Sequence, residues 1–285
     1  MDTKGASASK AAVDARTLVV HVLAVAATVL VLLWCVHFRG GVALSSHNKQ
    51  LIFNLHPVLM VLGLVVLAGE ATLSYRSLPV SRDARKKVHL ALHAAGLAVG
   101  ILGVYAVFKF HVESGIPNLY SLHSWLGIAT ITLYALQWLA GFLAFFFPGA
   151  SPATRRATLP WHALLGLLVF VFAVATAQLG FLEKLTFLQG PPLRLPKYGA
   201  EALLVNFTAV VVLILGVAVV LSTVTIDTTR GQVEIKWMVL GACSMDAGFA
   251  SEMFISSNSL IEISTWVLHR GGGTGGLQPP WEEKN

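Results

Sequence analysis

The chain has 285 residues, of which 55% are hydrophobic and only 12% are charged. About a quarter of the residues of a soluble globular domain are charged, so this composition excludes an ordinary soluble domain and indicates a helical membrane protein. The net charge of +6 is unevenly spread along the chain, which favours membrane topology over nucleic-acid binding as its cause.

Six apolar segments, separated by short polar connections, follow an N-terminal tail of residues 1–16. A helix needs about 20 residues to cross a hydrocarbon core about 30 Å thick, and lipid tolerates no unpaired backbone. We therefore expect an all-α membrane protein whose six-helix transmembrane domain covers residues 17–225. The predicted spans are residues 17–37, 51–75, 88–110, 121–147, 161–182 and 201–225.

Lysine and arginine are more frequent on one side of these spans. The N-terminal tail and residues 76–87 and 148–160 together carry ten of them, and the opposite loops carry six. By the positive-inside rule, both termini and these two loops are expected in the cytosol. The first apolar stretch is longer than the h-region of a signal peptide, so we interpret it as a retained span.

Residues 226–285 contain no further segment that could span a membrane. MVLGACSMDAGFA is too short and interrupted, and RGGGTGGLQPPWEEKN is rich in glycine and proline. We expect a disordered cytosolic C-terminal tail here and assign it no function.

Four consecutive spans, the second to the fifth, each place a histidine near one end. His56 and His123 lie near the outer ends of their spans, and His89 and His162 near the inner ends, at intervals of 33, 34 and 39 residues. A central antiparallel four-helix bundle would then receive two histidines at each of two depths. Neutral imidazole is a common metal ligand and bundle cores often hold cofactors, so each pair suits the axial positions of a haem. The alternative is a polar contact between membrane helices.

The third span contains a second histidine, His93, four residues after His89 and therefore on the same face of the helix. His89 and His162 each lie two residues into their spans, whereas His93 would lie about 6 Å deeper. Pairing at equal depth favours His89 as the ligand. We expect His93 to line the pocket or to bond a propionate or a carbonyl.

Seven short motifs stand in series along the apolar part of the chain: VHFRGGVALSS, FNLHPVLMVLG, KKVHLALH, YSLHSWLG, QWLAGF, PWHALLG and ALLVN. Together they resemble the cytochrome b561 family, in particular its plant ascorbate-dependent group, over roughly residues 17–225. The resemblance implies six transmembrane helices, two b-type haems and usually a homodimer. It implies a transmembrane oxidoreductase that takes electrons from cytosolic ascorbate and delivers them to monodehydroascorbate or, in some members, to a ferric chelate. By this resemblance His56 and His123 hold the outer haem iron, and His89 and His162 hold the inner one.

Ascorbate is an anion at neutral pH, so the donor site implied by the resemblance should be basic and close to the inner haem. The basic pairs Lys86–Lys87 and Arg155–Arg156 both lie within seven residues of an inner histidine. We predict that these four residues bind ascorbate. The alternatives are that they only determine topology or contact anionic lipid.

We predict the outer substrate site from Lys109, Phe110, His111, Asn118 and Tyr120. Tyr120 lies three residues, about one helical turn, before His123 and should sit at the haem edge. His111 could return a proton to the acceptor radical, so His111 and Tyr120 are the predicted catalytic residues. The alternative is an aromatic belt at the membrane interface.

Two other functions fit histidines in membrane spans: a metal-ion or proton transporter, and a quinone-linked cytochrome b subunit. Transporters usually need carboxylates or broken helices at mid-membrane, but the middle of spans two to five is apolar. A quinone-linked subunit would need partner subunits and a quinone pocket. The expected partners are therefore ascorbate, the electron acceptor, membrane lipid and a second copy of the chain, without nucleic acid. The resemblance suggests the vacuole or another endomembrane, with the plasma membrane as the alternative.

Overall fold

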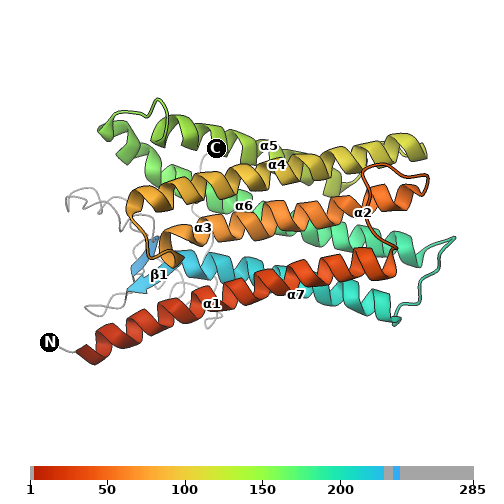
Figure 1. The fold of residues 1–285 in the computed structure, drawn as a ribbon, viewed down its shortest axis with the longest axis horizontal. Helices are drawn as coiled ribbons and strands as arrows, with labels where there is room; N and C mark the ends of the chain where they lie inside the picture. Colours follow the sequence, from red (N-terminus) through yellow and green to blue (C-terminus); the bar gives the residue numbers. More distant parts are fainter. Residues whose placement is uncertain (1–2, 228–233, 238–285) are drawn as a thin grey trace, which may run out of the picture. The chain divides into compact units, whose positions relative to one another are not determined.

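Long helices make up most of the computed structural model, which describes residues 3–227 and 234–237 (Figure 1). Two short strands, β1 and β2, pair in a two-stranded sheet. The elements are α1 (Thr3–Leu33), η1 (Trp34–Phe38), α2 (Lys49–Met60), η2 (Val61–Leu67), α3 (Ala68–Ser77), α4 (Arg82–Ser114), α5 (Leu122–Phe145), α6 (Pro152–Gln189), α7 (Ala200–Thr223), β1 (Val224–Asp227) and β2 (Glu234–Trp237).

The predicted six transmembrane helices are confirmed. In the described part of the chain, six helices are long and apolar enough to cross a membrane. The π-helical segments η1 and η2 continue α1 and α2, so α2, η2 and α3 form one span in Figure 1. The six spans are Ala15–Phe38, Lys49–Ser77, Arg82–Ser114, Leu122–Phe145, Pro152–Gln189 and Ala200–Thr223.

Helices α4 and α6 begin earlier than the apolar pattern predicts, and include most of the basic residues assigned to cytosolic loops. Ser81 caps α4 by accepting a hydrogen bond from the Ala84 backbone N–H, and Ser151 caps α6 through Thr154. A serine cap satisfies an otherwise unpaired N–H, and lysine and arginine are good helix formers. Hydropathy therefore marks where these helices enter the apolar region, and not where they begin.

Pro57 lies inside α2, directly after His56. The helix begins at Lys49, capped by Asn48, so Pro57 is an interior residue and not a first-turn residue. Proline has no N–H to donate, and one carbonyl of the preceding turn loses its helical partner. The chain continues from Val61 as the π-helical segment η2, a distortion typical of functional sites in helices.

Helices α2, α4, α5 and α6 form the four-helix bundle that carries the paired histidines. Helix α4 packs on α2, η2, α3 and α5, and α5 packs on α6. Helices α1 and α7 pack on each other and cover the side of the bundle formed by α3, η2 and α6. The buried core lies along this cover, with Val20, Val31, Val212 and Val219 fully enclosed.

Polar contacts at two places attach the first span, α1 and η1, to the rest of the domain. His21 Nδ1 lies 2.8 Å from Glu70 Oε1 on α3, which gives His21 a structural contact between two helices. At the η1 end of this span, the Glu201 carboxylate on α7 accepts from Trp34 at 3.0 Å and pairs with Arg39.

The predicted C-terminal tail begins within β1 and also contains β2. The remainder of residues 226–285 lies outside the described residues, so the disorder expected there stays a prediction.

Candidate functional site

The four histidines of the bundle meet in two facing pairs. The rings of His56 on α2 and His123 on α5 have centroids 6.0 Å apart and planes inclined at 83°. The rings of His89 on α4 and His162 on α6 have centroids 6.4 Å apart, with planes at 67°. We refer to these two regions as the His56–His123 end and the His89–His162 end.

Three of the four rings are held by backbone carbonyls of a neighbouring helix. The Nδ1 atoms of His56, His89 and His123 lie 3.0, 2.9 and 3.0 Å from the carbonyl oxygens of Gly103, Ala71 and Thr176. A carbonyl can only accept, so Nδ1 carries the proton and donates it. The lone pair of each ring is then on Nε2, which has no hydrogen-bond partner among the described residues. This is the arrangement of a histidine that ligates a metal through Nε2.

His162 is held differently, by a side chain. Gln137 Nε2 on α5 lies 3.0 Å from His162 Nδ1 and also donates to the His162 carbonyl at 2.6 Å. Gln137 therefore fixes both the ring and the backbone of this residue.

Two glycines provide the surfaces against which His123 and His162 lie. A Cβ atom at Gly180 would be 2.7 Å from His123 Cε1, and one at Gly141 would be 2.7 Å from His162 Cε1. Such approaches are too close for any side chain, so only glycine allows the rings to occupy these positions. The arrangement is reciprocal, because α5 carries His123 and Gly141 while α6 carries His162 and Gly180.

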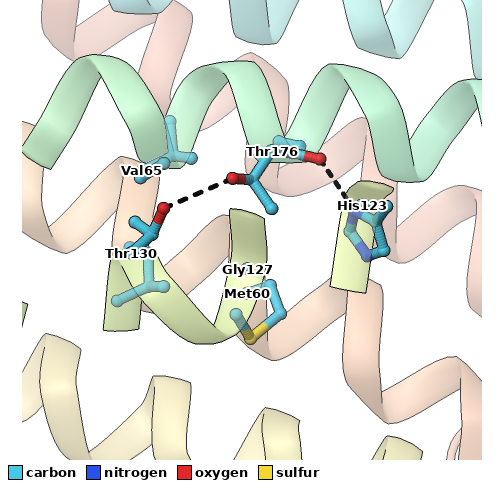
Figure 2. Close-up of a pocket in the computed structure, with 9 residues that line it drawn as sticks. Met60, Val65, His123, Gly127, Thr130 and Thr176 are labelled. Carbon is cyan, nitrogen blue, oxygen red and sulfur yellow. Dashed lines mark hydrogen bonds between the residues drawn. The ribbon is translucent and has the colours of Figure 1, made fainter. Parts of the chain in front are cut away.

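A small cavity adjoins His123 between η2, α5 and α6. Figure 2 shows Thr176 between His123 and Thr130, with its carbonyl directed at the His123 ring and its hydroxyl 3.5 Å from the Thr130 hydroxyl. The cavity has a volume of about 30 Å³, which is room for about one water molecule.

His93 lies beside the His89–His162 pair and does not face His162. Its ring centroid is 4.5 Å from that of His89, and its Nδ1 lies 2.6 Å from the hydroxyl of Tyr134 on α5. This geometry favours His89 as the residue that opposes His162. His93 instead links α4 to α5.

The two predicted basic pairs lie at the beginnings of α4 and α6. Lys86 reaches Phe146, with Nζ 5.5 Å from the ring centroid, and the neighbouring Phe145 ring is 5.2 Å from His162. Lys87 instead pairs with Asp83 at 2.7 Å. Arg155 and Arg156 are exposed near the beginning of α6. The structure thus directs Lys86 towards the His89–His162 end and Lys87 towards a carboxylate.

The residues predicted for the outer site lie near the His56–His123 end. The buried Phe110 ring is 5.8 Å from the His111 ring, and His111 Nδ1 lies 3.0 Å from Asn118 Oδ1. Tyr120 is exposed, in the connection before α5. Partial burial, and then the nearby Glu183 carboxylate, raise the pKa of the Tyr120 hydroxyl above its usual value of about 10. The hydroxyl therefore remains a hydrogen-bond donor at neutral pH.

Sequence comparisons decide which family this arrangement belongs to. Residues 55–188 match the family model described as eukaryotic cytochrome b561. The probable ascorbate-specific transmembrane electron transporter 1 of Oryza sativa subsp. japonica is 59% identical over 73% of this chain and 88% of its own length. The transmembrane ascorbate ferrireductase 1 of Arabidopsis thaliana is 55% identical over 73% of this chain and 86% of its own length. A transmembrane ascorbate-dependent reductase of Mus musculus is 40% identical over 65% of this chain and 73% of its own length. The chain belongs to the cytochrome b561 family.

Membership of this family implies haem b, and the histidine geometry of this cytochrome b561 fits that group. A metal–imidazole bond is about 2.0 Å long, so two such bonds on opposite sides of one metal place the ring centroids about 6 Å apart. The observed separations of 6.0 and 6.4 Å agree with this value. The cavity beside His123 is far smaller than a porphyrin, so the fit rests on the histidines, their hydrogen bonds and the two glycines.

Several residues of this cytochrome b561 were missed as site residues by sequence reasoning. Tyr134 and Gln137 are polar residues in an apolar span and lie three residues apart, on one helix face, which is a signal that could have been used. Gly180 gives no such signal, because its importance depends on how α5 and α6 pack. Lys184 was counted only among the loop charges that determine topology. It lies in α6, one turn after Gly180.

Proposed function

We propose that this cytochrome b561 is an ascorbate-dependent transmembrane oxidoreductase with two haem b groups, one at each histidine pair. The observation that carries the proposal is the presence of two facing histidine pairs, near opposite ends of one four-helix bundle. Relatives named as ascorbate-specific electron transporters and ascorbate ferrireductases support ascorbate as the donor. Family membership does not favour the transporter or the quinone-linked subunit.

His56, His89 and His123 would hold the irons through Nε2, because each donates from Nδ1 to a backbone carbonyl. His162 would use the same atom once the Gln137 amide turns its oxygen to accept from Nδ1. When bound, a haem with two imidazole ligands carries one electron and has no open position for dioxygen. Two such groups, one at each histidine pair, would divide the electron's path across about 30 Å of hydrocarbon into shorter distances.

Ascorbate would bind at the His89–His162 end, where it gives up one electron and one proton. Lys86 is the strongest of the predicted contacts, because it lies over Phe146, next to the Phe145 ring that contacts His162. Lys87 is expected to contribute less, because it already pairs with Asp83. Arg155 and Arg156 are exposed and would draw the anion by long-range attraction.

The acceptor, monodehydroascorbate or a ferric chelate, would bind at the His56–His123 end. The hydrogen bond to Asn118 orients the His111 ring, and the exposed, protonated Tyr120 hydroxyl can donate to an acceptor oxygen. Monodehydroascorbate takes up one electron and one proton, and His111 is placed to supply that proton.

The topology and assembly of the protein belong to the same proposal. The excess of lysine and arginine supports a cytosolic His89–His162 end with both termini on that side. We place the protein in the vacuolar or another endomembrane, as a homodimer.

The test is a reduced-minus-oxidised absorption spectrum of membranes that contain the full chain, with ascorbate as reductant. Wild type should show the α-band of a b-type haem. His89→Ala and His123→Ala should each remove part of that band, because each variant leaves one iron with a single ligand. His93→Ala is the matched control and should retain the full band.

The absence of any haem band in well-expressed wild type would overturn the proposal. A haem band that appears with a quinol as reductant, and not with ascorbate, would favour the quinone-linked alternative. Loss of the band in His93→Ala but not in His89→Ala would reverse the assignment of the ligand on α4.

A further inference from the structure

Lys184 places a positive charge directly beside the aromatic contacts of the His56–His123 pair. Its Nζ lies 3.7 Å from the centroid of the Phe53 ring, and a long hydrogen bond of 3.4 Å joins it to Gln50 Oε1. The Phe53 ring is itself 6.2 Å from the His56 ring and 5.2 Å from Phe110. One ring therefore separates the ammonium group from a proposed haem ligand.

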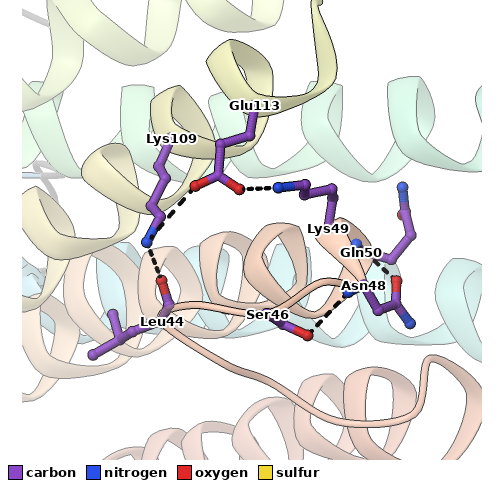
Figure 3. A network of polar contacts seen from close by, with 7 residues as sticks. All are labelled: Leu44, Ser46, Asn48, Lys49, Gln50, Lys109 and Glu113. Carbon is purple, nitrogen blue, oxygen red and sulfur yellow. Dashed lines mark hydrogen bonds and ion pairs between the residues drawn. The ribbon is translucent and has the colours of Figure 1, made fainter.

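Two other helix lysines at this end share one carboxylate. Figure 3 shows Glu113 between Lys49 and Lys109, with the two nitrogens 2.5 and 3.9 Å from its oxygens. Lys109 also donates to the Leu44 carbonyl at 2.7 Å. Glu113 cancels one of their two positive charges, and both ammonium groups are already engaged by these partners.

Lys184, in contrast, has no carboxylate within 4.0 Å among the residues that the structure describes. The adjacent Glu183 accepts a hydrogen bond from Ser121 at 3.2 Å, so its carboxylate is engaged by the beginning of α5. A half-buried ammonium group that has only a ring face and one amide oxygen retains capacity for an anion. Gln50 is exposed and Phe53 is only half-buried, so a small solute can approach this position from water.

We propose that Lys184, above the Phe53 ring, is the cationic contact for a small anionic electron acceptor at the His56–His123 end. The inference rests on the proposed function and adds to it the charge that selects the acceptor. A carboxylate-liganded ferric complex and monodehydroascorbate are both anions and share this chemistry. The ferric complex takes up one electron that ascorbate supplied, with no bond or proton transferred, whereas monodehydroascorbate also takes up one proton.

The test measures reoxidation of purified full-length protein in nanodiscs, after its haems have been reduced by ascorbate. Stopped-flow absorbance follows the reaction with ferric citrate, which is anionic, and with tris(phenanthroline)cobalt(III), which is cationic. Lys184→Gln should lower the second-order rate constant for ferric citrate by about tenfold at low ionic strength, and by less in high salt, because screening removes the attraction. The rate with the cationic oxidant should stay the same or rise.

Two variants control for folding and for general surface charge. Lys184→Arg keeps the cation and should retain most of the rate. Lys49→Gln removes a lysine that is paired with Glu113, so it should change the rate less than threefold. A separate experiment generates monodehydroascorbate enzymatically and follows its decay by electron paramagnetic resonance. If Lys184→Gln lowers the rate with only one of the two acceptors, that acceptor is the anion that Lys184 contacts.

Equal rates for wild type and Lys184→Gln with both anionic acceptors would overturn the inference while leaving the proposed function intact. A wild-type protein that ascorbate does not reduce, or that no acceptor reoxidises, would instead reject the proposed function. An equal loss with the anionic and the cationic oxidant would assign Lys184 a structural role, which also overturns the inference.

Discussion

The two ends of the bundle hold their histidines in different ways. At the His56–His123 end both rings donate to backbone carbonyls, those of Gly103 and Thr176. At the His89–His162 end only His89 does so, and a side-chain amide, Gln137, contacts His162. A backbone carbonyl is present whatever the side chain is. Substitutions of Gly103 or Thr176 therefore leave the hydrogen bonds of the His56–His123 end in place, whereas a substitution of Gln137 removes the one to His162.

Glycine substitutions should have the largest effect, and they should lower haem binding equally at the two ends. Gly180→Ala should prevent His123 from ligating, because its Cβ would lie 2.7 Å from the ring, and Gly141→Ala should do the same to His162. Each variant should lose about half of the bound haem, since overpacked sites rarely relax without displacing a side chain. Haem content per protein, measured by the pyridine haemochrome assay, checks this.

Gly127→Ala is the control, because its Cβ would lie at an ordinary 3.4 Å from Thr176. Full haem content in Gly180→Ala would show that the ring is not confined as described.

Removing a hydrogen-bonding side chain should have a smaller effect, and this effect should differ between the two ends. Gln137→Leu should weaken haem retention at the His89–His162 end by about 10–100-fold, as is usual when the partner of a metal-bound histidine is lost. Thr176→Val should weaken neither end, because the carbonyl that holds His123 remains. The measurement is the rate of haem transfer to apomyoglobin, and equal rates for both variants would contradict the difference between the ends.

Substitutions of the donor-side lysines should have the smallest effect of these three kinds of change. Lys86→Gln should raise the KM for ascorbate several-fold, whereas Lys87→Gln should change it less than twofold, because Asp83 already pairs with Lys87. Initial rates of haem reduction at varied ascorbate concentration check this. A larger effect of Lys87→Gln would show that the pair with Asp83 opens when ascorbate binds.

The apolar pattern was sufficient to predict the six spans and the pairing of the four histidines. Both depend on quantities that a sequence contains, namely the length of apolar runs and the distance of a residue from their ends. His89 was preferred over His93 by the same depth argument, and in the structure His89 is the residue opposite His162.

The contacts that hold the histidines could not be predicted in the same way. Gly180, Gln137 and Lys184 matter because of the rotation of one helix against another, and packing sets that rotation. The beginnings of α4 and α6 were missed for a different reason. Their first turns are polar, and the serine caps that stabilise them leave no trace in hydropathy.

The reciprocal arrangement of α5 and α6 has a consequence for insertions and deletions. Gly141 follows His123 by eighteen residues, and Gly180 follows His162 by the same number, which is five helical turns or about 27 Å. Each helix therefore presents its histidine and its glycine on one face, at a separation close to the thickness of the hydrocarbon core. Adding one residue between them would rotate the glycine by about 100° and carry it away from the opposing ring. The number of residues between these positions, more than the identity of those residues, keeps both histidine pairs and their glycines at matched depths.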